Sequence, residues 1–345
     1  MSKNDPVILR DAETYLKEGG SEFKNYVIIG AKGLLGSYLL DFMSQVNSIL
    51  GVRTNTVGIV RSYSPYLQNL EKRSGIKIET LETLESNLTD LENIHVIHAA
   101  SPASVVKVMS DVSHIITSNV HLTERIFRIL EKIGGRITYF SSGEVYGDSP
   151  NYPIIENNYS GFDHLSIRGY YPEVKRFTET KLRIWHELTD IPVTIFRIFH
   201  TFGPGISADD ERIFASTIFD LINERSIVLK SQGRTRRSFL YSSDLAAGIK
   251  VSESNNQFDY FNIAGEKEIS ILEFAQLVQK INSKRKIEFI SEYMELPTHP
   301  SPILRGLADT SKLRALGWNP KVSTFHAIER TVESTRWRIR QGYID

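Results

Sequence analysis

The feature that most constrains the fold is the alternation of short apolar runs with segments long enough for a helix. Runs of four or five mostly apolar residues occupy 26–29, 56–60, 94–98, 136–140 and 193–197. Strands that are apolar along their whole length are typical of parallel sheets covered by helices on both faces. The sequence therefore predicts an α/β fold built on a doubly wound parallel sheet.

The length of 345 residues predicts two lobes, since one domain usually holds about 100 to 200 residues. Residues 25–200 are expected to form the first lobe, to which a segment at about 234–262 returns. Residues 201–233 and 263–345 are expected to form a smaller C-terminal α/β substrate lobe, with prolines breaking the last sixty residues. Residues 1–24 carry a short helical pattern ended by Gly19-Gly20 and are expected to pack on the main body.

Composition excludes several classes of protein. The 41 basic and 41 acidic residues give no net charge, which argues against a general nucleic-acid binder or an electrostatically held membrane protein. The chain has no cysteine, so disulfides, thiolate metal sites and cysteine nucleophiles are excluded. No apolar run approaches the roughly 18 residues of a membrane-spanning helix, and the start does not follow a signal-peptide plan. We expect a cytoplasmic protein without a metal site.

Three glycines, Gly30, Gly33 and Gly36, follow the first apolar run and precede a helical stretch from Leu34 to Val46. Glycines at a strand-to-helix turn let backbone N–H groups approach a pyrophosphate, as in the Rossmann dinucleotide fold. We predict NAD(P) binding here, and the alternative is a glycine-rich turn that holds no ligand. The predicted contacts within this turn are Gly30, Lys32, Gly33, Leu34, Leu35 and Gly36.

The second apolar run ends in Val60-Arg61-Ser62, where an NAD-specific protein usually places an acid for the ribose 2′-hydroxyl. Arg61 can pair with a 2′-phosphate instead, which favours NADP over NAD. An arginine that only faces solvent is the alternative, and NAD stays open.

The segment Tyr171-Pro-Glu-Val-Lys175 places a phenol and an ammonium one helical turn apart. Ser142 follows the run at 136–140, and parallel sheets carry their ligand sites at the carboxyl ends of strands. We therefore predict that Ser142, Tyr171 and Lys175 form one acid–base unit beside the nicotinamide, with the lysine charge moving the pKa of the phenol toward neutrality. The alternative is a surface contact between Tyr171 and Lys175.

The segment His98-Ala99-Ala100-Ser101 ends the run at 94–98 and is expected to line the cofactor. His95 and His98 are three residues apart on a predicted strand, so their side chains are expected to point to opposite faces. That arrangement argues against a metal pair.

The order of these motifs resembles the extended short-chain dehydrogenase/reductases that modify nucleotide-diphosphate sugars. The resemblance runs from about Tyr26 to about Trp337 and is strongest to UDP-glucuronate decarboxylases and dTDP-glucose 4,6-dehydratase-like enzymes. It is carried by the glycine turn, the His98 segment, the stretch from Ser142 to Gly147 and the Tyr171–Lys175 pair. It extends through Arg197-Ile-Phe-His-Thr-Phe-Gly-Pro204, Asp210-Glu-Arg-Ile-Phe214, Arg237-Ser-Phe-Leu-Tyr-Ser-Ser-Asp244, Phe261-Asn-Ile-Ala-Gly265 and Leu316-Gly-Trp-Asn-Pro320.

The resemblance implies that Tyr171 removes a proton from a sugar hydroxyl, usually at carbon 4, while hydride passes to NAD(P) and a 4-keto sugar forms. Dehydratases of this family carry an Asp-Glu pair after the catalytic Ser or Thr, whereas this chain has Gly143-Glu144. The resemblance implies that Glu144 takes the proton from carbon 5. The acid that expels the carbon 6 hydroxyl in dehydratases is missing from this chain. It favours decarboxylase-like chemistry that supplies precursors for polysaccharide or glycan synthesis. The alternative is that Glu144 is a turn residue that pairs with a neighbouring backbone group or with an arginine.

The resemblance also implies that Ser142, Glu144, His200, Arg212 and Arg237 contact the substrate, with Arg237 gripping the diphosphate. His200 stands where these families usually have an Asn, and the Ser104–Met109 segment lacks the aromatic and proline residues of the decarboxylases. A surface ion pair is the alternative for both arginines.

Three further possibilities remain open at this point. A 4-epimerase or a 4-keto-sugar reductase needs Ser142, Tyr171, Lys175 and the cofactor, but not Glu144. A non-catalytic NAD(P)-binding sensor or scaffold would keep the fold and the cofactor without catalysis. The resemblance implies a homodimer formed by the helix after Ser101 and the helix from Tyr171 to Leu188. Ile115, Ile116, Leu122 and Ile126 suit either that interface or packing on the sheet.

Overall fold

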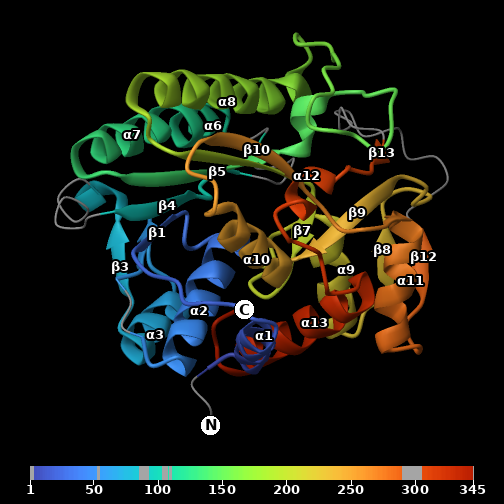
Figure 1. Ribbon diagram of the computed structural model, residues 1–345. Helices are drawn as coiled ribbons and strands as arrows, with labels where there is room; N and C mark the ends of the chain where they lie inside the picture. Colours follow the sequence, from blue (N-terminus) through green and yellow to red (C-terminus); the bar gives the residue numbers. More distant parts are fainter. Residues whose placement is uncertain are drawn as a thin grey trace.

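The computed structural model describes residues 4–52, 55–84, 93–102, 108, 111–289 and 305–344. Most of the Ser104–Met109 segment lies outside these residues. The chain has two lobes side by side, each with its own sheet (Figure 1).

The main sheet has seven strands, all paired in parallel, in the order β10-β6-β5-β4-β1-β2-β3. The predicted doubly wound α/β fold is confirmed. The chain leaves β1 toward β2 and β3 on one side, and returns to β4 on the other side. This reversal opens a crevice at the carboxyl ends of β1 and β4, where such sheets bind ligands. The strands are β1 (Tyr26–Ile29), β2 (Val57–Val60), β3 (Lys77–Thr80), β4 (Ile94–His98), β5 (Gly135–Ser142), β6 (Val193–Ile198) and β10 (Phe258–Ile263).

Helices cover both faces of this sheet, which explains why β1, β2 and β4 are buried at every position. One face carries α2 (Leu34–Ile49), α3 (Pro65–Ser74) and α10 (Ser242–Ser252). The other carries α6 (Val112–Ile116), the π-helical turn η2 (Thr117–His121), α7 (Leu122–Ile133) and α8 (Tyr170–Thr189). Short 3₁₀ turns, η1 (Leu81–Thr83), η3 (Gly143–Tyr146) and η4 (Ile167–Gly169), lie in the connections.

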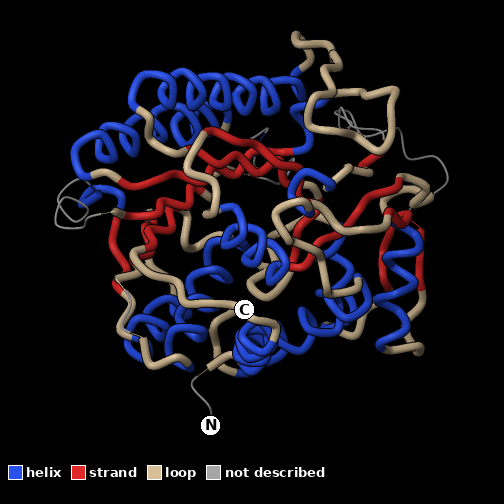
Figure 2. Tube along the Cα trace, in the orientation of Figure 1, coloured by secondary structure: helices blue, strands red, loops and turns tan. Residues whose placement is uncertain are grey.

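The second lobe is built on β9 (Arg236–Tyr241), which pairs with β7 (His200–Phe202), β11 (Glu268–Ser270) and β13 (Arg305–Gly306). A two-stranded sheet of β8 (Ile227–Leu229) and β12 (Ile287–Phe289) lies beside it (Figure 2). Phe202, Phe214, Phe239 and Phe274 form the centre of its core. Its helices are α9 (Ile213–Ile222), α11 (Ile271–Ile281) and α13 (Thr324–Arg340). The short helix α12 (Ser311–Arg314), which was expected in this lobe, packs instead on β10 of the main sheet through Leu313.

The segment at 234–262 is divided between the two sheets. Its first part, β9, belongs to the second lobe, whereas α10 and β10 return to the main sheet. The reason is that β9 continues the pairing begun by β7, and β10 closes the edge beside β6.

The N-terminal segment forms α1 (Pro6–Lys17), which packs on α2 and α13. Asp11 of α1 is buried and accepts hydrogen bonds from Tyr38 (2.9 Å), Tyr241 (2.7 Å) and Arg330 (2.7 Å). This single carboxylate therefore ties the N-terminal helix to both lobes. Among the described residues, no helix combines the length and apolar character needed to cross a membrane.

Candidate active site

A cleft that is partly open to solvent lies where the carboxyl ends of the central strands face the second lobe. It brings together residues predicted for the cofactor, the catalytic unit and the substrate. Its lining includes Leu35, Ala99, Ser101, Ser142, Glu144, Tyr171, Lys175, His200 and Arg212.

The glycine turn fits a pyrophosphate at the edge of this cleft. Gly30 has a φ of +86°, and a Cβ there would lie 2.8 Å from the Cα of Ala100. Only glycine lets the turn approach β4 this closely. Gly33 begins α2 without any side-chain cap, so the N–H groups at this helix end stay available for an anion. Gly30, Gly33, Leu34, Leu35 and Gly36 would hold the pyrophosphate of NAD(P).

Two cationic side chains lie at the adjoining ends of β1 and β2. Lys32 donates a hydrogen bond from Nζ to the Ser62 hydroxyl at 2.9 Å. Arg61, which directly precedes Ser62 in the chain, is exposed. Both charges lie where β2 ends, which is the place for the adenosine ribose in this fold.

Ser142, Tyr171 and Lys175 are brought together although β5 and α8 are separate elements. The Tyr171 phenol is hydrogen-bonded to the Ser142 hydroxyl, and Lys175 Nζ lies 5.8 Å from the Tyr171 ring centroid. Lys175 Nζ donates to the Phe140 carbonyl oxygen at 2.6 Å and lies 4.7 Å from the Tyr139 ring centroid. The predicted grouping of these three side chains is present in the structure.

The predicted shift of the Tyr171 pKa toward neutrality is wrong for this structure. Burial, and then the negative charge of Glu144, raise the pKa of Tyr171 to about 12, while the hydrogen bond from Ser142 and nearby arginines oppose the rise. Burial also lowers the pKa of Lys175 to about 7, so the ammonium group of Lys175 loses its proton easily. Sequence spacing indicated the Tyr–Lys neighbourhood but not the desolvation that dominates both groups. An oxidised nicotinamide ring bound in the cleft would supply a positive charge that favours the phenolate.

Glu144 is held by an arginine that sequence reasoning missed. Arg168, in η4, donates from Nη2 to Glu144 Oε1 at 2.5 Å, and its guanidinium carbon lies 5.6 Å from the Tyr171 ring centroid. The Arg168 side chain is only 7% exposed. The pairing expected of a turn glutamate is therefore present within the cleft itself. The only signal in the sequence was an arginine three residues before Tyr171.

Gly143 is the position at which dehydratases of the resembled family carry an acid. A Cβ at Gly143 would lie 2.9 Å from ring carbons of Phe199. A longer side chain would have to displace this nearly buried ring, which packs with Val145 and Tyr146. The space for the missing acid is therefore filled by Phe199.

Of the predicted substrate residues, Ser142 and Glu144 belong to the main lobe, and His200, Arg212 and Arg237 to the second lobe. His200 and Arg212 line the cleft, whereas Arg237 is not among its lining residues. Arg212 forms a two-point ion pair with Asp210, with Nε to Oδ1 at 2.9 Å and Nη2 to Oδ2 at 2.6 Å, so the ion-pair alternative is present here. Burial, and then the charges of Arg237 and Arg212, lower the pKa of His200 to about 3, which makes the imidazole neutral. Arg237, on β9, is largely buried. Burial lowers the pKa of Arg237, and the charge of Glu144 opposes part of this fall.

Only some of the residues that follow β4 line the cleft. Ala99 and Ser101 line the cleft, Ala100 packs behind Gly30, and the Ser101 hydroxyl accepts from Asn119 Nδ2 at 3.1 Å. His95 contacts Thr138 and Glu253, each at 2.8 Å, whereas His98 packs against Tyr139. Among the described residues, no group of three or more His, Asp or Glu side chains is placed to hold a metal.

Comparison with known proteins finds relatives that are UDP-glucuronic acid decarboxylases. UDP-glucuronic acid decarboxylase 1 of Arabidopsis thaliana is 31% identical over 226 residues, which cover 65% of this chain and 51% of that protein. Decarboxylase 3 of the same plant is 30% identical over 226 residues, covering 65% of this chain and 64% of that protein. The chain therefore spans less than two thirds of the length of these relatives.

Solved structures match over nearly the whole chain. The UDP-glucuronic acid 4-epimerase of Bacillus cereus, solved with UDP-glucuronic acid and NAD, superposes with a TM-score of 0.75 at 22% identity, covering 90% of this chain and 99% of that one. The UDP-glucose 4-epimerase of Thermus thermophilus, solved with NAD, superposes with a TM-score of 0.76 at 18% identity, covering 90% of this chain and 98% of that one. These likenesses establish the fold.

The family model described as NAD dependent epimerase/dehydratase matches residues 26–264, from the first strand of the main sheet to just beyond its last. The match includes the glycine turn, the Ser142–Tyr171–Lys175 unit and Arg237. This chain belongs to the NAD-dependent epimerase/dehydratase family.

Proposed function

We propose that this chain is an NAD(P)-dependent enzyme that oxidises a nucleotide-diphosphate sugar at carbon 4 and converts the 4-keto intermediate in a decarboxylase-like reaction. The observation that carries the proposal is one cleft that holds Ser142, Tyr171, Lys175 and Glu144 beside a glycine turn suited to a pyrophosphate. The curated decarboxylase relatives and the NAD-bound epimerase neighbours support the same substrate class.

In this proposal, Tyr171 as phenolate takes the proton from the sugar hydroxyl while Ser142 donates a hydrogen bond to the same oxygen. Bound NAD(P) supplies the hydride acceptor. Lys175 stabilises the phenolate by charge and hydrogen-bond donation. Arg237 and Arg212 would bind the diphosphate from the second lobe, because a guanidinium can donate two parallel bonds to phosphate oxygens. If the sugar is a uronic acid, its 4-keto form is a β-keto acid that loses carbon dioxide without an added acid. The enolate that remains would take up a proton at carbon 5 through Glu144, and the hydride taken from carbon 4 would then return to that carbon.

The test is mass spectrometry of products after incubation with UDP-, dTDP-, GDP- and CDP-sugars that include uronic acids. We expect loss of carbon dioxide from a nucleotide uronic acid. Loss of water would identify a dehydratase, and a gain of two hydrogens a reductase. Unchanged mass with a changed sugar configuration would identify a 4-epimerase. Absence of any conversion across the panel would contradict the proposal.

The second candidate is a nucleotide-sugar 4-epimerase or 4-keto-sugar reductase. It is favoured by the ion pair between Glu144 and Arg168, which engages the one carboxylate that decarboxylation would need beyond the Ser142–Tyr171–Lys175 unit. Return of hydride to carbon 4 requires no proton transfer at carbon 5. Chromatographic separation of the sugar epimers distinguishes this candidate.

We also propose NADP as the preferred cofactor. Support comes from Lys32 and Arg61 at the end of β2, where the sequence has no acid for a free ribose hydroxyl. Replacing Arg61→Ala is expected to weaken NADP binding by roughly 10-fold or more, the value of a charged hydrogen bond, while NAD binding changes little. Isothermal calorimetry with both dinucleotides measures this, and Lys72→Ala, exposed on α3, controls for net charge. Tighter binding of NAD than NADP by the wild-type chain would contradict the preference.

A homodimer is proposed through α6 and α8. Ile115, Leu122 and Ile126 are buried inside the chain, so they belong to internal packing. Phe177, Ile184 and Leu188 of α8 are 56%, 53% and 76% exposed, and Val112 and Ile116 of α6 are also exposed. Both helices lie on the same outer face (Figure 1). Exposed apolar side chains on adjacent helices suit a helix-bundle interface.

Light scattering is expected to show a dimer at micromolar concentration. Leu188→Glu should shift the protein to monomer, because a charge would be buried in the interface without a partner. Arg183→Ala, on the same helix but polar and exposed, should leave the dimer intact. A wild-type monomer would reject the interface.

A further inference from the structure

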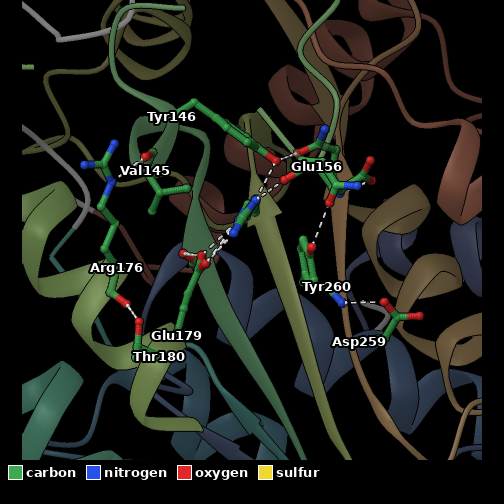
Figure 3. Close-up of polar contacts among 12 residues, drawn as sticks. Val145, Tyr146, Glu156, Arg176, Glu179, Thr180, Asp259 and Tyr260 are labelled. Carbon is green, nitrogen blue, oxygen red and sulfur yellow. Dashed lines mark hydrogen bonds and ion pairs between the residues drawn. The ribbon is translucent and has the colours of Figure 1, made fainter. Parts of the chain in front are cut away.

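A buried ion pair lies directly behind the catalytic unit, on the side of β5 and α8 away from the glycine turn. Arg197 of β6 donates to Glu179 of α8 from Nε at 3.2 Å to both carboxylate oxygens and from Nη2 to Oε2 at 2.7 Å. The two side chains are only 12% and 10% exposed. We call Glu179, Arg197, Ser141, Tyr146 and Asn262 the Glu179–Arg197 cluster. Figure 3 shows Glu179 and Tyr146 converging on the guanidinium between them.

The carboxylate of Glu179 also binds the strand that carries Ser142. The Ser141 hydroxyl donates a hydrogen bond to Glu179 Oε1. Ser141 directly precedes Ser142, and Glu179 follows Lys175 by one helical turn. One carboxylate therefore fixes the distance between the end of β5 and the catalytic face of α8.

The guanidinium extends the cluster to the turn that carries Glu144. Arg197 Nη1 donates to the Tyr146 hydroxyl at 3.0 Å and to the Glu156 carbonyl oxygen at 2.8 Å. Tyr146 in turn donates to Asn262 Oδ1 on β10 at 2.6 Å. Tyr146 ends η3, the turn that begins at Gly143. The cluster thus holds each of the three segments that bear Ser142, Glu144 and Lys175.

Lys175 has few groups that favour its charged form. From β5 it meets the Phe140 carbonyl and the Tyr139 ring, from β4 the neutral His98, and on its own helix Tyr171 and Glu179. Burial opposes the ammonium, and the charge of Glu179 favours it. Removing that charge would also leave Arg197 as an uncompensated cation nearby. Both changes would lower the pKa of Lys175 and so favour its neutral amine.

We propose that Glu179 and Arg197 are positioning residues for the proposed reaction: they hold Ser142 and Tyr171 in register across β5 and α8, and Glu179 supplies the counter-charge for the Lys175 ammonium. The inference rests on the proposed function for the role of Lys175. It goes beyond that function because neither residue lies in contact with the reacting atoms.

The first test is an NMR titration of lysine ε-carbons in the full chain, with Lys175→Met identifying the signal. In Glu179→Gln, the Lys175 signal is expected to titrate about one pH unit or more below its wild-type value, since one unit corresponds to a tenfold change in equilibrium. Glu187→Gln, which removes an exposed ion pair with Arg183 on the same helix, should leave the titration unchanged. The titration needs no substrate, so it is decided even if the proposed reaction is wrong.

The second test is kinetic. Glu179→Gln is expected to lower kcat by roughly 10-fold or more with little change in KM, as for loss of an interaction made in the transition state, and Glu179→Asp should recover part of it. If Glu179→Gln does not fold, Glu179→Met combined with Arg197→Met replaces the pair by apolar side chains that can keep the fold. A folded variant, single or double, with wild-type Lys175 titration and wild-type kcat would overturn the proposal.

Discussion

Tyr171→Phe is expected to reduce turnover by about 10²- to 10⁴-fold, the usual contribution of a general acid–base group, while the affinity for the dinucleotide changes little. The phenol lies next to Ser142, where we propose that the proton is transferred, whereas the pyrophosphate is expected at the glycine turn of α2. Stopped-flow measurement of nicotinamide reduction and calorimetric titration of the cofactor separate the two effects.

Tyr170→Phe is the matched control for this substitution. The neighbouring Tyr170 hydroxyl donates to the Val112 carbonyl at 2.9 Å, outside the cleft, so its removal should leave kcat unchanged. Lys175→Met should behave like Tyr171→Phe, because it keeps the buried volume but loses the charge. Near wild-type turnover by Tyr171→Phe on the true substrate would end the assignment of Tyr171.

Glu144→Gln is expected to separate oxidation at carbon 4 from the step that follows it. Any reaction that passes a proton at carbon 5 should slow by about 10²-fold or more, because an amide cannot exchange that proton. Epimerisation or 4-keto reduction should continue at nearly the wild-type rate. Mass spectrometry of products and intermediates over time distinguishes these outcomes. Glu173→Gln is the matched control, because Glu173 is a half-buried glutamate on α8 that also pairs with an arginine, Arg176.

We rank decarboxylation above 4,6-dehydration on the residue at position 143. Expelling a hydroxyl needs a proton donor, and the donor position is glycine with Phe199 filling the space beside it. Gly143→Asp alone should therefore fail to create a dehydratase, since the added side chain meets the Phe199 ring. Rapid release of a 4-keto-6-deoxy sugar by the wild-type protein would show that this ranking is wrong.

The sequence by itself determined the main sheet and the identity of the central groups. Apolar runs mark five of the strands in the main sheet, and Gly30 and Gly33 mark the turn into α2. The Tyr171–Lys175 spacing likewise placed both side chains on one face of α8, the proposed catalytic face. These features are local: strand burial, backbone freedom at glycine and one helical turn are each written in a few adjacent residues.

Only the tertiary structure decided the electrostatics and the supporting contacts. Arg168 meets Glu144 across 24 positions, and Phe199 fills the space at Gly143 across 56. The pKa of Tyr171 rises rather than falls because burial, and then the charge of Glu144, outweigh the Ser142 hydrogen bond and the charges of Arg168 and Arg212, and burial is a property of the packed fold. Spacing in the sequence places groups on one element, but the charge and free space around a group depend on elements that meet only after folding.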